Sequence, residues 1–189
     1  MRRIKPTAKA PDSSAGPLPA KAVYLTKAEV RAEKARRAFP DFVRTVRPGL
    51  SGDAFHQRYY EVLDRFARGE IRKLIVTLPP QHGKSLGSTI LLPAYLLGRA
   101  PQLRIAVASY NLSLASRFNR QIQRLMDTKS YRTVFPDSRI KTPGSKEQTI
   151  RTAEEFEVAG HPGGVISVGR EGALTGNSVD VMIIDDLYR

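Results

Sequence analysis

The sequence contains no cysteine. Disulfide bonds and thiolate metal sites are therefore excluded, and the composition is compatible with a reducing compartment. No apolar run approaches the ~20 residues of a membrane-spanning helix, and the N-terminus lacks the apolar stretch of a secretory signal. We expect an intracellular protein that works without a membrane partner.

Acidic residues are scarce relative to basic ones: 18 Asp and Glu stand against 31 Lys and Arg, which gives a net charge of +13. The excess is uneven, since residues 1–47 hold 12 Lys or Arg and only 4 acidic residues. Such a balance favours a polyanionic partner, nucleic acid above all. A solvated basic tail that binds nothing in particular explains the charge equally well.

Proline and small polar residues mark the N-terminal segment. Residues 1–25 contain four prolines, Pro6, Pro11, Pro17 and Pro19. This composition predicts a flexible basic tail, because it offers too little apolar surface to offset the entropy lost on ordering. The remaining residues, 26–189, are numerous enough for one domain with a sizeable core.

Two helices are predicted before any strand. The first begins at Thr26, whose spacing from Glu29 fits a capping box, and it ends before Pro40. The second spans residues 53–67, where large apolar side chains recur at helical spacing, and Gly69 closes it.

Three short apolar runs follow: IRKLIVTL (71–78), LRIAVAS (103–109) and VDVMIID (179–185). Because the runs are continuous rather than alternating, they predict strands buried on both faces of a parallel sheet. Helices are expected over residues 84–97, where Pro93 bends or shortens the helix, and over residues 113–126. The pattern around residues 160–164 predicts a hairpin before the last strand. This order of elements indicates an α/β fold.

The segment LPPQHGKS, residues 78–85, lies between the first predicted strand and the helix after it. A phosphate-binding loop needs backbone N–H groups at a helix N-terminus, a lysine for the β and γ phosphates, and a hydroxyl for magnesium. Gly83, Lys84 and Ser85 supply these groups. The usual glycine five residues before Gly83 is replaced by Leu78, and we expect the paired prolines to hold the loop open instead. A chance tripeptide in a surface turn is the alternative.

A second motif, VMIIDD at residues 181–186, delivers two carboxylates at the end of a predicted strand. Ligands bind at this end of the strands in parallel α/β sheets. Asp185 is predicted to hold Mg²⁺, and Asp186 to orient or deprotonate the attacking water. Two aspartates that begin a solvated turn are the alternative. Since the two motifs occur together, each at a predicted strand end, we predict a nucleotide phosphatase site.

Five segments together carry a resemblance to a known family: PPQHGKS, VASYNLSLASRFNRQIQRLM, YRTVFP, GALTG and VMIIDD. They resemble the N-terminal ATPase of bacteriophage terminase large subunits, the motors that package viral DNA, and the likeness runs from about Phe39 to Arg189. The resemblance implies a P-loop NTPase of the additional-strand class, with a parallel sheet flanked by helices. It also implies a homo-oligomeric ring that drives double-stranded DNA into a procapsid in the cytoplasm of a bacterial host, with a small terminase subunit and a portal as partners.

The resemblance also assigns roles to residues. Lys84 would stabilise charge on the γ phosphate, Ser85 and Asp185 would hold Mg²⁺, and Asp186 would be the catalytic base. The nucleotide-binding positions would be His56, Gln57, Pro80, Gln81, His82, Gly83, Lys84 and Ser85. The first two of these lie where relatives contact the adenine edge, although packing among aromatic side chains would account for a histidine there.

Two residues depart from the family pattern. Many relatives have an arginine at the position of Gln81, where a cation neutralises charge in the transition state. Arg170 is one conceivable substitute. Many such motors have a glutamate at the position of Asp186, and the shorter aspartate requires the water to lie closer or to act through a second water.

The sequence ends three residues after Asp186. The additional strand, the coupling motif and the nuclease domain that the resemblance implies would all follow this point. We therefore expect residues 26–189 to be a partial terminase ATPase domain, truncated after the Walker B strand, with apolar strand edges exposed. Two alternative functions stay open: a helicase-like P-loop ATPase, and an inert fragment that acts only as a basic DNA-binding module.

Overall fold

The computed structural model describes residues 25–50, 52–142, 144, 146, 148–172 and 178–188. The predicted tail, residues 1–25, lies outside this part of the chain apart from Leu25. The elements are, in order, α1 (Lys27–Arg37), α2 (Phe39–Val46), α3 (Ala54–Ala67), η1 (Leu86–Leu91), α4 (Leu92–Arg99), β1 (Arg104–Ser109), α5 (Leu112–Met126), α6 (Lys129–Val134), β2 (Glu155–Glu157), β3 (Gly164–Gly169) and β4 (Val181–Asp185).

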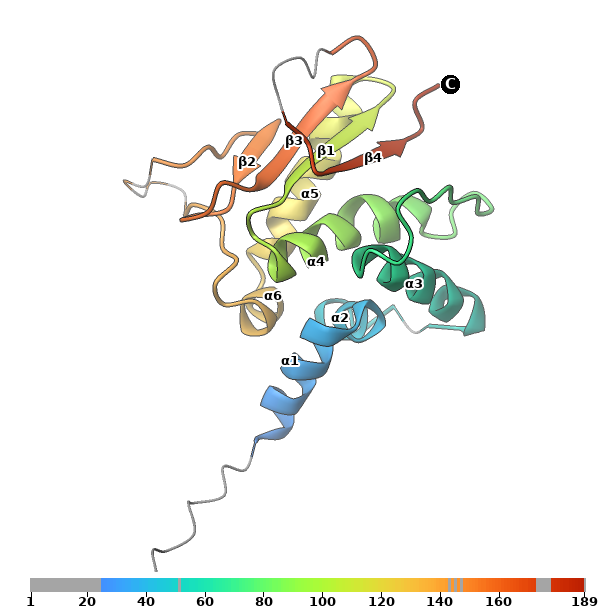
Figure 1. Ribbon diagram of the computed structural model, residues 1–189, viewed down its shortest axis with the longest axis vertical. Coiled ribbons are helices and arrows are strands. Elements are labelled where there is room, and N and C mark those ends of the chain that lie inside the picture. Colours follow the sequence, from blue (N-terminus) through green and yellow to red (C-terminus); the bar gives the residue numbers. More distant parts are fainter. Residues whose placement is uncertain are drawn as a thin grey trace, which may run out of the picture.

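The described strands form one sheet in the order β2-β3-β1-β4 (Figure 1). β1 pairs in parallel with both β3 and β4, while β2 is antiparallel to β3. The α/β prediction is confirmed, but the sheet is mixed rather than purely parallel. The hairpin predicted before the last strand accounts for the difference, because its two arms, β2 and β3, both join the sheet.

The predicted strand at residues 71–78 is not a strand in the structure. The segment is extended, and its side chains alternate between exposed and partly buried. Leu74, Val76 and Leu78 pack against the core, whereas Ile75 is 92% exposed. Among the described residues no strand pairs with this segment. The strand prediction for residues 71–78 is therefore wrong, because the hydrogen-bonding partner that defines a strand is missing among the described residues.

The last strand is not buried on both faces, contrary to the prediction for residues 179–185. Ile183 and Asp185 point into the core, but Met182 and Ile184 on the opposite face are 49% and 57% exposed. β1 does meet the prediction, since its residues from Ile105 to Ser109 are all buried. The reason is position: β1 has a strand on each side, whereas β4 lies at the edge of the sheet.

The capping box predicted at Thr26 is present, and Asp53 provides a further cap. Thr26 accepts a hydrogen bond from the backbone N–H of Glu29, whose side chain accepts one from Thr26 in return, so the capping box is complete. Asp53 caps α3 by accepting from the backbone N–H of His56 at 2.8 Å. Gly69, with a φ of +77°, follows the end of α3 as predicted.

Two prolines shape the helices differently from the expectation. α1 does end before Pro40, but Pro40 lies in the first turn of α2, where its missing N–H leaves no hydrogen bond unmade. Pro93 occupies the first turn of α4, and the residues before it form the π-helix η1 instead of a bent α-helix. Because Pro93 cannot donate to the carbonyl of Thr89, the α-helical pattern is interrupted and a wider turn precedes it.

α3 is held against the helices that cover the sheet by an aromatic cluster of Phe39, Phe42, Tyr60, Tyr95, Tyr131 and Phe135. The backbone N–H of Phe39 also donates to the buried carboxylate of Asp64 at 2.8 Å, which joins α2 to α3. η1, α4 and α5 pack together beneath the sheet (Figure 1). This packing brings the N-terminal half of α3 beside the loop that precedes η1.

Two alanine substitutions in β4 test its one-sided burial. Ile183 is 9% exposed and Ile184 is 57% exposed. We expect Ile183→Ala to lower the free energy of unfolding by about 2–5 kcal/mol, because it leaves a cavity in the core. Ile184→Ala should change it by less than about 0.5 kcal/mol. Urea denaturation measures both, and equal losses would contradict the one-sided burial.

Candidate functional site

The loop between residue 78 and η1 obtains its shape from left-handed backbone at two positions. Gln81 has a φ of +64° and Gly83 a φ of +75°. A glycine at the position of Leu78 is therefore not needed, because the reversal of the chain occurs later in the loop. A non-glycine residue with positive φ is strained and is found preferentially at functional sites. Among the described residues the only other one is Asp186, at +47°.

The loop lysine and the two aspartates of the second motif meet, as the sequence predicted. Nζ of Lys84 lies 2.9 Å from Oδ1 of Asp186 and 3.3 Å from Oδ1 of Asp185. The hydrogen bond to Asp186, helped by the charge of Asp185, raises the pKa of Lys84 above its ordinary value in spite of partial burial. The three charges thus form a compact cluster at the carboxyl end of β4.

The two aspartates differ in their surroundings. Only 4% of the Asp185 side chain is exposed, against 65% for Asp186. Oδ2 of Asp185 accepts a hydrogen bond from the hydroxyl of Thr89 in η1 at 3.0 Å. Asp185 is therefore held in one orientation between η1 and the sheet, while Asp186 projects toward solvent from its left-handed backbone.

α3 holds the first turn after the loop. The hydroxyl of Tyr59 donates to the carbonyl of Lys84 at 2.8 Å, and that carbonyl also accepts from the hydroxyl of Ser88 at 2.9 Å. The ring of Tyr59 leaves no room for a side chain at Gly87, because a Cβ there would lie 2.5 Å from a ring carbon. Tyr59 thereby fixes the position of the backbone that carries the lysine.

Of the two residues predicted to contact adenine, His56 and Gln57, one lies beside the loop. The two ring nitrogens of His56 face Oδ1 of Asp53 at 2.8 Å and the carbonyl of His82 at 3.3 Å. Gln57 points elsewhere, since its side-chain amide donates to the carbonyl of Gly52 at 2.8 Å. Of the pair, His56 contacts the loop backbone, and Gln57 does not.

His82 itself folds back onto the loop. Its Nδ1 lies 2.8 Å from the carbonyl of Pro80, to which it donates, and its ring makes an edge-to-face contact with Phe55. The side chain is thus occupied in shaping the loop.

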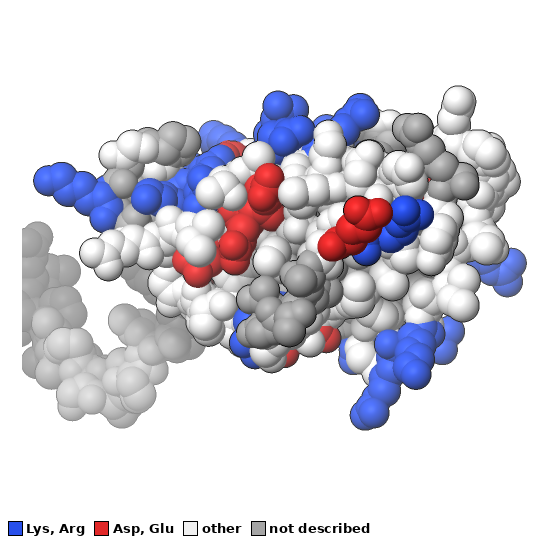
Figure 2. All heavy atoms as spheres, turned by 90° about the horizontal axis from the view of Figure 1, so that it is seen from above, with Lys and Arg blue, Asp and Glu red and all other residues white. Residues whose placement is uncertain are grey.

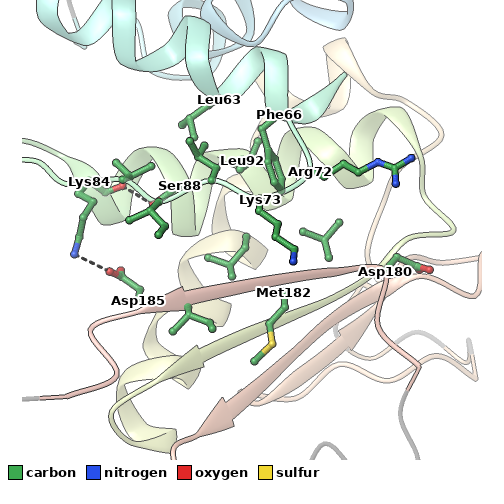
Figure 3. A pocket seen from close by; sticks show the side chains of 16 residues that line it. Leu63, Phe66, Arg72, Lys73, Lys84, Ser88, Leu92, Asp180, Met182 and Asp185 are labelled. Atoms are coloured by element: carbon green, nitrogen blue, oxygen red, sulfur yellow. Dashed lines mark hydrogen bonds and ion pairs between the residues drawn. The ribbon is translucent and has the colours of Figure 1, made fainter. Parts of the chain in front are cut away.

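Two hollows adjoin the charge cluster. The first, of about 600 Å³, is lined by residues 78–81, 83–86 and Asp186. The second, of about 530 Å³, separates residues 72–76 from β4 and is also lined by Lys84 and Asp185. Figure 3 shows the second hollow, with Lys73 projecting into it and Lys84 reaching Asp185 at one end. Both hollows meet at the lysine.

The ends of β1 and β3 lie at the same edge of the sheet as the charge cluster. Ser109, the last residue of β1, is in register with Asp185, and the N–H of Tyr110 donates to the carbonyl of Asp186 at 3.0 Å. Arg170, which follows β3, has its guanidinium 5.6 Å above the ring of Tyr110 and 5.9 Å from that of Tyr188. The arginine considered as a substitute for a cation at Gln81 therefore lies at the same edge of the sheet, stacked on tyrosines.

The residues present fit a nucleotide with Mg²⁺. Ser85 is half-buried in the wall of the loop hollow, and Asp185 offers a fixed carboxylate. In the described ranges no three His, Cys, Asp or Glu side chains cluster as a metal site. Mg²⁺ beside phosphates needs only one or two carboxylates.

Sequence reasoning missed Tyr59, Ser88 and Thr89. Tyr59 lies in the helix predicted over residues 53–67, where its spacing indicates packing rather than a bond to the loop. Thr89 lies in the π-helical turn, whose geometry decides which hydroxyl after the lysine reaches Asp185. A hydroxyl-rich stretch directly after the loop, GKSLGST, was the available signal.

No family model, curated protein or solved structure matches the chain. The site is therefore interpreted from its own residues and geometry. Within the described ranges, no helix combines the length and the apolar character that crossing a bilayer requires.

Replacing Tyr59 with phenylalanine tests the contact between α3 and the loop. The substitution keeps the ring against Gly87 and removes only the hydroxyl that bonds to Lys84. Because a hydrogen bond of this kind contributes about 0.5–1.5 kcal/mol, we expect the free energy of unfolding near neutral pH to fall by about that amount. Urea denaturation of both proteins measures the difference.

The order of stability of the same two proteins should change at high pH. Burial raises the pKa of Tyr59 to about 12 from its ordinary value of 10.0, so the folded state favours the neutral phenol. The stability that this phenol contributes is complete below about pH 10 and is lost as the pH rises toward about 12. The phenylalanine of the variant does not titrate, so the stability advantage of the wild-type protein should fall by about 1.4 kcal/mol per pH unit in this window and reverse its sign before the window ends. A constant difference would show that Tyr59 is not buried as described.

Proposed function

We propose that this protein is an ATP hydrolase with a phosphate-binding loop, and that it is the ATPase part of a DNA-packaging motor of the terminase large-subunit type. One observation carries the proposal: Lys84 contacts two carboxylates that stand 101 and 102 positions later in the sequence. Neither motif alone is specific. Their convergence at the carboxyl end of a parallel strand is the arrangement that binding of a nucleotide with its metal requires.

The surroundings of the side chains support distinct roles. Lys84 exchanges its carboxylate partners for the β and γ phosphates when the nucleotide binds. Asp185, buried and oriented by Thr89, holds Mg²⁺ together with Ser85. Asp186, which is exposed, orients the attacking water. The bound Mg²⁺–ATP supplies the reactive phosphoryl group, and neutralisation of its charge is the largest contribution that such sites make to the rate.

The hollow between residues 72–76 and β4 supports the more specific part of the proposal. In the additional-strand class, a further strand lies between the strand before the loop and the strand that bears the metal carboxylate. Here the segment before the loop is extended but unpaired among the described residues, and β4 presents a free edge to it. Double-stranded DNA, a small terminase subunit, a portal and a homo-oligomeric ring remain proposals that rest on the resemblance.

Substitution of Lys84 tests the ATPase. We expect the wild-type protein to bind a fluorescent ATP analogue with Mg²⁺ and to release phosphate from ATP. Lys84→Ala should reduce phosphate release by about 10²- to 10³-fold, because a preorganised charge at the transferring group is lost. Steady-state phosphate release and equilibrium binding of the analogue are the two measurements.

Lys73→Ala is the matched control. Lys73 projects into the adjoining hollow but is not part of the phosphate loop (Figure 3), so its loss should leave nucleotide binding and phosphate release unchanged. If the two variants behave alike, or if the wild-type protein binds no nucleotide, the proposal is wrong. Binding of DNA without any response to Lys84→Ala would favour the inert DNA-binding module.

A further inference from the structure

The outward face of α5 carries a row of arginines. Arg117, Arg120 and Arg124 are all exposed, and their spacing of three and four residues aligns them on one side of the helix. The opposite side of α5 is buried against β1 and β3 through Ala115, Phe118, Ile122, Leu125 and Met126. The row is therefore fixed to the sheet by a rigid, well-packed helix.

These three arginines differ from most others in having no carboxylate partner. Arg37, Arg44, Arg65 and Arg132, for example, each pair with an Asp or Glu. No ion pair involves the α5 row in the part of the chain that the structure describes. α5 also contains no acidic residue. Three unneutralised charges on one helix face attract a polyanion.

The rest of the basic charge is dispersed. Figure 2 shows Lys and Arg side chains in several separate groups around the face that it displays, rather than in one continuous field. The net charge of +13 therefore does not by itself locate a binding surface. A row of unpaired arginines on one rigid helix does locate such a surface.

We propose that the exposed face of α5, formed by Arg117, Arg120 and Arg124, binds the phosphate backbone of duplex DNA. The inference rests on the proposed function for the identity of its partner. At a rise of about 1.5 Å per residue the row spans about 10 Å. That length matches about three phosphates of one strand, which follow at about 3.4 Å along the duplex axis. Guanidinium groups bind phosphate oxygens through paired hydrogen bonds.

The location of α5 joins this surface to the ATP site. Asn111 caps α5 by accepting from the N–H of Leu114 at 2.8 Å, and the neighbouring Tyr110 donates its N–H to the carbonyl of Asp186. The N-terminus of α5 is thus two residues away from a direct backbone contact with the catalytic aspartate. A displacement of Asp186 would therefore be transmitted through one short, rigid connection to DNA that is bound on α5.

The test compares two triple variants of the full chain. R117Q/R120Q/R124Q removes the row, and K34Q/R47Q/R58Q removes the same charge from exposed positions of α1, the turn after α2, and α3. Binding of a short DNA duplex of arbitrary sequence is measured by fluorescence anisotropy across a range of salt. We expect the α5 variant to bind on the order of 100-fold more weakly at about 0.1 M salt, and its log K against log salt slope to be shallower by about 3.

The control variant should keep most of the affinity and a slope close to that of the wild-type protein. Equal losses in the two variants, or an unchanged slope in the α5 variant, would overturn the inference, because net charge would then explain the binding. Both variants should retain binding of the fluorescent ATP analogue. If the wild-type protein binds ATP but no DNA, both DNA as the partner and this surface are ruled out. If it binds DNA but no ATP, the proposed ATPase is wrong, and the proposal for α5 is judged on the two variants alone.

Discussion

The ion pairs between Lys84 and the two aspartates join the parts of this molecule on which its proposed function depends. They connect the loop before η1 to the end of β4, two segments that no hydrogen-bonded ladder joins directly. A lysine beside two carboxylates is stable without a ligand, since the opposite charges satisfy one another. The same arrangement keeps the lysine where phosphates would arrive. Charge neutralisation among these side chains and the proposed recognition of an anion thus use one set of groups.

The precision of that cluster comes from the helices around it. η1 is wider than an α-helix, and its Thr89 bonds to Asp185. From the other side, Tyr59 of α3 bonds to the carbonyl of Lys84. Each of these contacts joins residues that are distant in the sequence, so the cluster depends on the packing of α3 through the aromatic core. A change in that packing would displace the lysine without altering any residue of the loop.

The sheet is less completely covered than an α/β domain usually is. Helices pack beneath β1 and β3, but β4 exposes Met182 and Ile184 on its other face and has a free edge toward residues 72–76. Free edges and exposed apolar faces favour association with another polypeptide. The region around the proposed ATP site is therefore also a region that favours association with another polypeptide.

Local patterns in the sequence were sufficient for several features. The capping box of α1, the α/β class and the apolar composition of β1 and β4 all follow from neighbouring residues, because helix caps and strand composition are short-range properties. The two motifs of the site were also visible as motifs. The sequence could not show that residues 71–78 lack a strand partner, because pairing depends on what lies beside the segment in space.

Tertiary structure alone decided how the site is assembled. Lys84 reaches both aspartates, the π-helical turn selects Thr89 for Asp185, and Gln81 and Gly83 together turn the loop that lacks a glycine at residue 78. The amino-acid sequence by itself determined which chemical groups are available and that Asp185 and Asp186 stand at the end of a strand. Which of those groups meet was decided only by packing, because contacts between residues about a hundred positions apart depend on the relative placement of whole helices and strands.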